Sequence, residues 1–402
     1  MNQLRSKEIL NSKGLPTVEV ELENDSGIFT ASVPAGISTG KYEAVQIETK
    51  QAIENIQNII APIIENEKLD NQKRIDETLI KLDGTKNKSN LGANAILPVS
   101  IAVLRAGAKE KNISLYDYIW RILDFKTGDF PKPSFNILEG GKHATSGLAF
   151  QEFMVVPQTD DASKNLEIGL KIYGMVKDSL LVKYGPEGAN LSAEGAFSVP
   201  LETIETALKL LMEAIEKSVF KNEVKIAIDV AASEFYDGQN YKVDGKLISK
   251  DELLKFYKLL ISKYPICSIE DPFYQEDFES FAKLKKTVGD NIIIFGDDLT
   301  VSNIERIKKA EKEKACSGLI LKPNQIGTVW QTIEATKQAR MYDWKIMVAN
   351  RAGETEDSFI ADLAVGVGAE FIKSGAPFPK ERMTKYNRLI EIQEEIKSKI
   401  NG

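Results

Sequence analysis

The last two-thirds of the chain repeat one pattern, in which a short apolar run ends in a charged or amide residue before a turn and a helix-forming segment. From VKIAID onward, the residues that end these runs are Asp229, Glu270, Asp297, Lys322, Asn350 and Lys373. They are 41, 27, 25, 28 and 23 positions apart, about one βα unit each once the hairpin-like insert NYKVDGK (240–246) is set aside. Near-continuous apolar runs are typical of strands covered on both faces. The pattern predicts an α/β fold with a parallel (βα) barrel, whose functional groups gather at the C-terminal ends of the strands.

In the first part of the chain the apolar residues recur with other spacings. The alternation in TVEVELEN, the turn residues at 24–27 and the run IFTASVP indicate a β-hairpin. The segments QAIENIQNIIAPIIE, IDETLIKL and GANAILPVSIAVLRAGAKEK have the period of amphipathic helices. The glycine, aspartate and prolines of FKTGDFPKP (125–133) interrupt this pattern. We therefore expect a smaller α+β N-terminal domain over residues 1–125 and a barrel domain over residues 131–402, whose first run, AFQEFMVVP, lies ahead of Thr159.

Composition excludes several classes of function. The chain has 52 Lys and Arg against 59 Asp and Glu, a formal net charge of −7, which disfavours binding to nucleic acid. No apolar stretch approaches the roughly 20 residues that cross a bilayer, and MNQLRSKEIL lacks the apolar core of a secretion signal. Cys267 and Cys316 lie in apolar runs, where buried thiols are more common than a disulfide. We expect a cytoplasmic protein without a membrane span.

Three acids end successive runs, namely Asp229, Glu270 and Asp297. Any one of them alone is best interpreted as the cap of the helix that follows. Together at one barrel mouth they would repel one another unless a divalent cation lay between them. His143 is the only histidine, so a multi-histidine transition-metal site is excluded and an oxygen-liganded ion such as Mg²⁺ is favoured.

Two lysines and a glutamate belong to the same predicted mouth. Beside a divalent ion the pKa of Lys322 or Lys373 falls, so that an amine can abstract a proton α to a carboxylate; neutralisation of excess carboxylate charge is the alternative. Glu152, flanked by apolar residues, is expected to have a raised pKa and an acid or shuttle role, or else to be a buried ion-pair partner. Arg351 can bind a carboxylate or phosphate bidentately, and the alternative is a surface ion pair.

Three further segments are informative but weaker. The loops AGISTG (35–40) and EGGKHATSG (139–147) have the composition of loops that let backbone amides approach a ligand closely. The acids of NRAGETED (350–357) precede the amphipathic segment FIADLAVGV and are interpreted as first-turn residues that complement its helix dipole.

Over essentially its whole length, the chain resembles the enolase (phosphopyruvate hydratase) family. The segments that carry the resemblance, in the family's order, are VPAGISTGKYEA, LDGTKNKSNLGANAIL, LAFQEFMVVP, SIEDPF, GDDLTVSN, LKPNQIGT, RAGETEDSFIADLAVG and IKSGAP. The resemblance implies a small α+β domain before an eight-fold barrel whose first units are irregular. It also implies a lyase of glycolysis and gluconeogenesis that dehydrates 2-phosphoglycerate to phosphoenolpyruvate with Mg²⁺ as cofactor.

The resemblance also implies a role for each site residue. Asp229, Glu270 and Asp297 would hold one Mg²⁺, and Ser38 would help to hold a second, catalytic one. Lys322 would be the base that takes the α-proton, and Glu194, helped by Glu152, would protonate the departing hydroxyl. The residues that would hold the substrate's carboxylate, phosphate and leaving group are Lys373, Gln151, His143 and Arg351.

The chain departs from the family's pattern at two places. Ser192-Ala193-Glu194-Gly195-Ala196 stands where the family has Gly-Asp-Glu-Gly-Gly, and Ala349-Asn350-Arg351-Ala352-Gly353 stands where it has Ser-His-Arg-Ser-Gly. A histidine has thus become Asn350, and a phosphate-binding serine has become Ala352, which removes a hydrogen bond to a charged group worth roughly 1.5–3 kcal/mol.

Three hypotheses remain open: an enolase proper, a paralogue that forms a metal-stabilised enolate on a related phospho- or phosphono-carboxylate, and a catalytically silent homologue. Enolases pair as dimers, and the resemblance sets Glu19 opposite a family arginine whose position is filled by Glu391. Arg388, one turn earlier on the same helix face, could supply the missing cation. We therefore expect a homodimer or a higher homo-oligomer.

Overall fold

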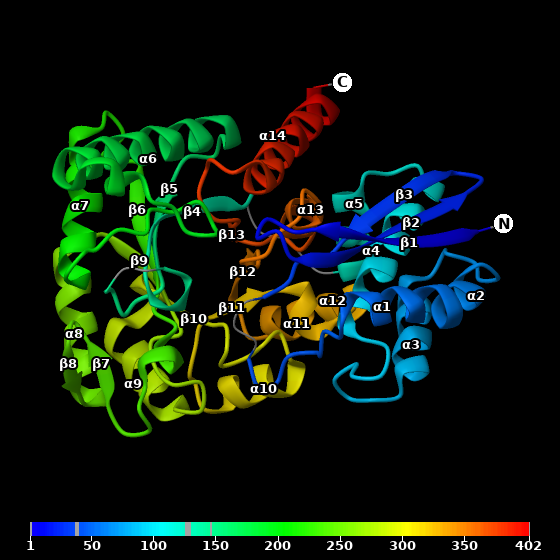
Figure 1. Cartoon of the computed structure of the whole chain (residues 1–402), viewed down its shortest axis with the longest axis horizontal. Coiled ribbons are helices and arrows are strands. Elements are labelled where there is room, and N and C mark those ends of the chain that lie inside the picture. Colours follow the sequence, from blue (N-terminus) through cyan, green and yellow to red (C-terminus); the bar gives the residue numbers. More distant parts are fainter. Residues whose placement is uncertain (1, 37–39, 125–129, 145–146, 402) are drawn as a thin grey trace.

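The computed structural model describes residues 2–36, 40–124, 130–144 and 147–401. In Figure 1 the barrel lies on one side, and the N-terminal sheet with its helices lies on the other. No helix among the described residues is both long enough and apolar enough to span a membrane.

The N-terminal part is an antiparallel three-stranded sheet covered by helices (Figure 1). Its strands are β1 (Gln3–Leu10), β2 (Pro16–Asn24) and β3 (Gly27–Ser32). Its helical elements are α1 (Thr49–Asn55), η1 (Ile56–Ile60), α2 (Ala61–Ile64), α3 (Gln72–Asp83), α4 (Ala93–Glu110) and α5 (Leu115–Leu123). The predicted hairpin and the three predicted helical segments are present. The strand β1, which is largely exposed, and the helix α5 were not singled out from the sequence.

Eight strands close into a barrel in the order β10-β11-β12-β13-β4-β5-β6-β9. They are β4 (Lys132–Glu139), β5 (Glu152–Pro157), β6 (Val224–Asp229), β9 (Ile266–Glu270), β10 (Ile293–Gly296), β11 (Gly318–Leu321), β12 (Lys345–Ala349) and β13 (Phe371–Lys373). The predicted α/β barrel is confirmed, although β4 was missed because it begins between the two prolines, Pro131 and Pro133, that interrupt the pattern.

The helices of the barrel part surround the strands (Figure 1). They are α6 (Ala162–Tyr184), α7 (Ile204–Lys217), α8 (Lys250–Lys263), α9 (Phe278–Val288), α10 (Ile304–Lys312), α11 (Pro323–Ile326), α12 (Val329–Arg340), α13 (Phe359–Gly366) and α14 (Lys380–Asn401). Short helical turns are η2 (Gly141–His143), η3 (Gly185–Ala189), η4 (Ala232–Phe235) and η5 (Gly289–Asn291). The hairpin predicted at 240–246 is present as β7 (Tyr241–Val243) and β8 (Lys246–Ile248).

The direction of β5 corrects the expectation of an all-parallel barrel. This strand runs antiparallel to both β4 and β6, while the other neighbouring strands are parallel. Its first residue, Glu152, therefore pairs with Glu139 at the end of β4 and with Asp229 at the end of β6. The reversal brings the start of β5 to the barrel mouth, rather than its end near Thr159.

Polar contacts join the N-terminal part to the barrel. Asp76 in α3 accepts a hydrogen bond from the backbone N–H of Trp330 in α12 at 2.7 Å. Arg105 in α4 forms a bidentate pair with Asp357, at 2.7 and 2.8 Å. Because these groups are largely buried, the two parts of the chain form one packed body around the barrel mouth.

Candidate active site

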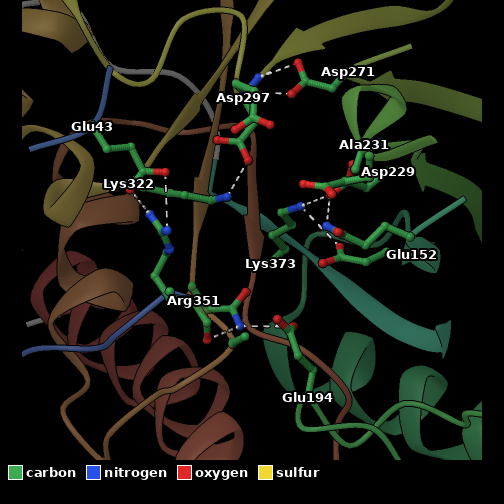
Figure 2. A pocket seen from close by; sticks show the side chains of 16 residues that line it. Glu43, Glu152, Glu194, Asp229, Ala231, Asp271, Asp297, Lys322, Arg351 and Lys373 are labelled. Atoms are coloured by element: carbon green, nitrogen blue, oxygen red, sulfur yellow. Dashed lines mark hydrogen bonds and ion pairs between the residues drawn. The ribbon is translucent and has the colours of Figure 1, made fainter. Parts of the chain in front are cut away.

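Lys373 is the central cation of the barrel mouth (Figure 2). Its Nζ lies 3.1 Å from Glu152 Oε2, 3.1 Å from Asp229 Oδ2 and 2.7 Å from Glu270 Oε2, and all four side chains are buried. Burial lowers the pKa of Lys373, but Asp229, Glu152 and Glu270 outweigh it and hold the pKa well above its ordinary value. Lys373 is therefore a permanent ammonium that binds three strand-end carboxylates together.

Lys322 is paired with the third predicted acid. Its Nζ lies 2.5 Å from Asp297 Oδ2, and Gln325 Nε2 donates to Asp297 Oδ1 at 2.8 Å. Burial lowers the pKa of Lys322, yet Asp297 raises it more, so the net pKa is raised. This is opposite to the lowered pKa expected beside a divalent cation, because the neighbour here is an anion.

Two carboxylates that the sequence analysis did not assign complete this side of the mouth. Asp271 accepts the backbone N–H groups of Asp297 at 2.9 Å and of Asp298 at 2.6 Å. One oxygen from each of Asp271, Asp297 and Asp298 lies within 4.8 Å of the others. The signal was present in the sequence, because each of the motifs SIEDPF and GDDLTVSN carries a second acid directly after the one that was chosen.

The donor set suits a hard divalent cation. Asp229 and Glu270 both accept hydrogen bonds from Lys373, whereas Asp297 lies with Asp271 and Asp298. The three predicted acids therefore belong to two neighbouring carboxylate groups and not to one. Every candidate ligand is an oxygen, and lysine ammonium groups supply the balancing charge. Oxygen ligands in this number fit a cation such as Mg²⁺ or Ca²⁺, and these side chains offer no soft ligand.

A second carboxylate trio lies on the other side of Lys373. Oxygen atoms of Glu139, Glu152 and Glu194 lie within 4.8 Å of one another, and all three side chains are buried. Burial raises the pKa of Glu152 to about 8; Lys373 opposes this rise, while Glu194, Asp229 and Glu139 add to it. The raised pKa predicted for Glu152 is confirmed, and so is the buried ion pair that was its alternative, formed here with Lys373.

The altered family positions make specific contacts beside this trio. Asn350 Nδ2 donates to Glu194 Oε2 and to the carbonyl oxygen of Arg351, both at 3.1 Å. The hydroxyl of Ser192 donates to Glu139 Oε2 and accepts the backbone N–H of Glu194 at 3.1 Å. These residues are therefore built into the acid side of the site.

Arg382 in α14 ties the two altered segments together. Its fully buried guanidinium donates from Nη1 to the carbonyl oxygen of Arg351 at 2.8 Å, and from Nη2 to those of Ala352 at 2.7 Å and Ala193 at 3.2 Å. The segments are far apart in sequence, so sequence reasoning did not find this residue.

Arg351 is buried and not part of a surface ion pair. Its Nη1 lies 2.8 Å from Glu43 Oε2 and 3.4 Å from Asn324 Oδ1. A Cβ at position 36 would fall 2.1 Å from Nη2, so Gly36 lets the loop pass over the guanidinium without displacing it. Figure 2 shows Arg351 pointing towards Glu43 and lying near Lys322.

The remaining predicted residues have different outcomes. Gln151 Nε2 donates to Asp229 Oδ2 at 3.3 Å, so this amide belongs to the mouth. Ser38 lies outside the described residues, and so does the side chain of His143, whose backbone forms part of η2. The interpretation of the NRAGETED acids as first-turn residues is wrong for Glu354, which is buried and pairs with Lys385 at 2.9 Å.

A barrel mouth with buried lysines, clustered carboxylates and an arginine defines an acid–base enzyme that handles an anionic substrate. Comparison with known proteins identifies the family. The model of the enolase C-terminal TIM barrel domain matches residues 128–401, and that of the enolase N-terminal domain matches residues 1–119.

Curated relatives agree with the family models. Enolase B of Dictyostelium discoideum is 44% identical over 420 residues, covering 98% of this chain and 95% of that protein. The enolase of Methanocaldococcus jannaschii is 44% identical over 403 residues, covering 97% and 94%. The chain belongs to the enolase family of lyases, whose activity depends on a divalent metal ion.

Proposed function

We propose that the protein dehydrates 2-phosphoglycerate to phosphoenolpyruvate in the presence of Mg²⁺. The observation that supports this most directly is the separation of a base side from an acid side. Lys322 lies with Asp297 on one side of the ammonium of Lys373, and Glu194 lies on the other (Figure 2). Elimination of water needs one group to take the α-proton and another to give a proton to the departing hydroxyl.

The residues divide this chemistry among them. Asp229, Glu270 and Asp297, from the two neighbouring carboxylate groups, would hold Mg²⁺, and Ser38 would contribute to a second ion. When bound, Mg²⁺ supplies positive charge to the substrate carboxylate and so acidifies the α-proton. Lys322 Nζ takes that proton as the neutral amine: a cation held by Asp297 would replace the ammonium as partner of this carboxylate and lower the pKa of the lysine, so that the ammonium proton is first lost to solvent. The buried Glu194, assisted by Glu152, protonates the departing hydroxyl.

The substrate's charges are held by cations and amides around the mouth. Arg351 binds an anionic group bidentately, in exchange for its pair with Glu43. Lys373, Gln151 and His143 hold the carboxylate and the leaving group. Because buried contacts fix the side chains of Lys373, Gln151 and Arg351, these three groups need little further ordering when the substrate binds.

Exchange of the α-proton with solvent deuterium tests the separate roles of base and acid. In the presence of Mg²⁺ and 2-phosphoglycerate, Lys322→Ala should lose exchange, whereas Glu194→Gln should retain exchange and lose formation of phosphoenolpyruvate. Lys308→Ala, at a half-exposed position on α10, is the matched control and should behave as wild type. Exchange that persists in Lys322→Ala would refute the role of this lysine.

The contacts of Ser192 and Asn350 favour a second candidate. They fill the acid side with groups that suit a paralogue acting on a related phospho- or phosphono-carboxylate with a different leaving group or acceptor. Exchange on 2-phosphoglycerate without any product, in the wild type, would favour this paralogue over the first proposal.

We also propose a homodimer located in the cytoplasm. Both cysteines are free and buried, as suits a reducing compartment. Arg388 does lie against Glu391, at 3.1 Å, but it also binds Asp362 at 3.0 Å and Glu395 at 2.8 Å. Within one chain it therefore already neutralises Glu391, which lessens repulsion from Glu19 of a partner chain.

A further inference from the structure

Gln325 is a buried amide with no role in the proposed reaction. It lies on the short helix α11, three positions after Lys322, and it is 1% exposed. Its Nε2 donates to Asp297 Oδ1 at 2.8 Å. An amide that is removed from water is costly unless its polar atoms are hydrogen-bonded, so this contact restrains both side chains.

The backbone that carries Gln325 is held from two sides. Its N–H donates to the carbonyl oxygen of Lys322 at 3.0 Å, and its carbonyl oxygen accepts the N–H of Ala44 at 2.8 Å. Pro323 begins α11, and Gly327, with a φ of +94°, ends it by donating to the carbonyl oxygen of Pro323 at 2.8 Å. The side chain of Gln325 therefore extends from a fixed backbone.

Ser302 helps to decide which end of the amide faces Asp297. Its buried hydroxyl accepts the backbone N–H of Lys322 at 3.0 Å and donates to Gln325 Oε1 at 2.8 Å, whereas its other acceptor, the carbonyl oxygen of Ile320, is 3.4 Å away. The carboxylate of Asp297, paired with the ammonium of Lys322, offers only acceptors. Both neighbours thus select the orientation in which Nε2 points to Asp297.

The two oxygens of Asp297 consequently have different neighbours. Oδ1 is held by the neutral amide of Gln325, and Oδ2 by Lys322 Nζ at 2.5 Å. The amide hydrogens repel a cation, whereas the ammonium, at the end of a flexible four-carbon chain, can give way to one. Asp271 already holds the backbone N–H of Asp297 at 2.9 Å, so the amide controls the remaining rotation of the carboxylate. Oδ2 is left as the oxygen that a cation can take.

We propose that Gln325, oriented by Ser302, is a positioning residue that holds Oδ1 of Asp297, presents Oδ2 alone to the cation and so favours Mg²⁺ over Ca²⁺. The inference rests on the proposed function, because it takes Asp297 as a ligand of the metal ion. Mg²⁺ demands a strict octahedral set of single oxygens, whereas Ca²⁺ accepts a carboxylate through one oxygen or through both. A carboxylate with one oxygen already bonded therefore suits Mg²⁺ better.

Isothermal titration calorimetry of the metal-free chain, without substrate, tests this role. Gln325→Met keeps the length of the side chain and removes its polar atoms, so the Kd for Mg²⁺ should rise at least about tenfold, the usual cost of losing a hydrogen bond to a metal ligand. The Kd for Ca²⁺ should change less than about threefold, because Oδ1 becomes available to this ion.

Gln393→Met is the matched control. Gln393 is a buried glutamine on α14 whose amide is also bonded at both ends: it donates to the carbonyl oxygen of Asp160 at 2.8 Å and accepts the N–H of Ala162 at 2.9 Å. These partners follow the end of β5 that lies away from the barrel mouth. Both dissociation constants of this variant should equal those of wild type.

Two results would overturn the proposal. One is an unchanged Kd for Mg²⁺ in Gln325→Met; the other is an equal rise of the Kd for Mg²⁺ and for Ca²⁺, as a merely structural role produces. If Gln325→Met does not fold, as judged by circular dichroism, Ser302→Ala takes its place. This variant frees the amide to turn and should lower the preference for Mg²⁺, and an unchanged preference would count against the inference.

The same titrations separate this inference from the proposed function. If wild type binds neither ion, the metal assignment is wrong and the role of Gln325 is wrong with it. If wild type binds Mg²⁺ and Gln325→Met binds it equally well, the role of Gln325 is wrong and the proposed function stands. If the preference changes as expected while wild type forms no phosphoenolpyruvate, the proposed substrate is wrong and the role of Gln325 stands.

Discussion

Asp76 should make the stability of the whole protein depend on pH. It is fully buried between α3 and α12, where its carboxylate accepts hydrogen bonds from Trp330 N–H at 2.7 Å and Gln72 Nε2 at 3.0 Å. Burial raises its pKa from 3.8 to about 6, against the opposing hydrogen bonds from Ser100, Trp330 and Gln72. An acid whose pKa is raised by folding binds its proton more tightly in the native state than in the unfolded state.

The sign and the size of the effect follow. The contribution of Asp76 to stability is fully present below about pH 4 and is lost as the pH rises through about 6. One pKa unit corresponds to about 1.4 kcal/mol, so the ionised form costs about 3 kcal/mol. For 402 residues the entropy of unfolding is about 0.8 kcal/mol/K, which converts this cost to about 3–4 °C in Tm.

Calorimetry of wild type and Asp76→Asn at pH 4 and pH 7 tests the reasoning. Asn cannot ionise, so the Tm of the variant relative to wild type should be about 3–4 °C more favourable at pH 7 than at pH 4. Taking this difference of differences cancels the cost of any imperfect hydrogen bond to Gln72. Asp290→Asn, at an exposed position, is the control and should show no such change. A Tm difference that is the same at both pH values would refute the argument.

Three further predictions concern the site and the assembly. In thermal-shift measurements, Mg²⁺ should raise the Tm of wild type but not of Asp297→Asn, since a ligand stabilises only the state that binds it; an equal shift in both contradicts the metal assignment. The double variant Ser192→Gly, Asn350→His restores the family's residues. It should lower the rate of dehydration at least about tenfold, because Ser192 and Asn350 hold Glu139 and Glu194. A gain in rate would instead indicate that these two positions mark groups for dehydration that the chain has lost. Arg388→Glu should lower the Tm, because it leaves Asp362 without its bidentate partner. Light scattering on wild type and on this variant decides whether the chain dimerises and whether Arg388 contributes to the dimer.

Local sequence patterns were enough to predict the barrel strands that lie between helices. The runs ending at Asp229, Glu270, Asp297, Lys322 and Lys373 all form barrel strands or their immediate ends, because an apolar run bounded by turns carries its own signal. The same reasoning failed at β4, where the two prolines masked the run that ends at Glu139.

The candidate site was predictable in its members but not in its pairings. Each residue at a strand end could be chosen from its position after an apolar run. The same rule could also have found Glu139, which ends SFNILE, and the doubled acids could have pointed to Asp271 and Asp298. No local signal marked Glu43 or Arg382, because each acts on a segment that is distant in the chain.

The sequence by itself determined the fold class, the order of most barrel strands and the acids and lysines of the mouth, since these follow from short-range periodicity and residue chemistry. Only the tertiary structure decided which charges meet. Barrel closure brings Lys373 to Glu152, Asp229 and Glu270 at once, and the reversal of β5 turns Glu152 towards Glu139. The partners of Lys373 lie more than 100 positions away in the sequence, and the direction of β5 is set by its pairing with β4 and β6, so nothing within a local window of sequence specifies either.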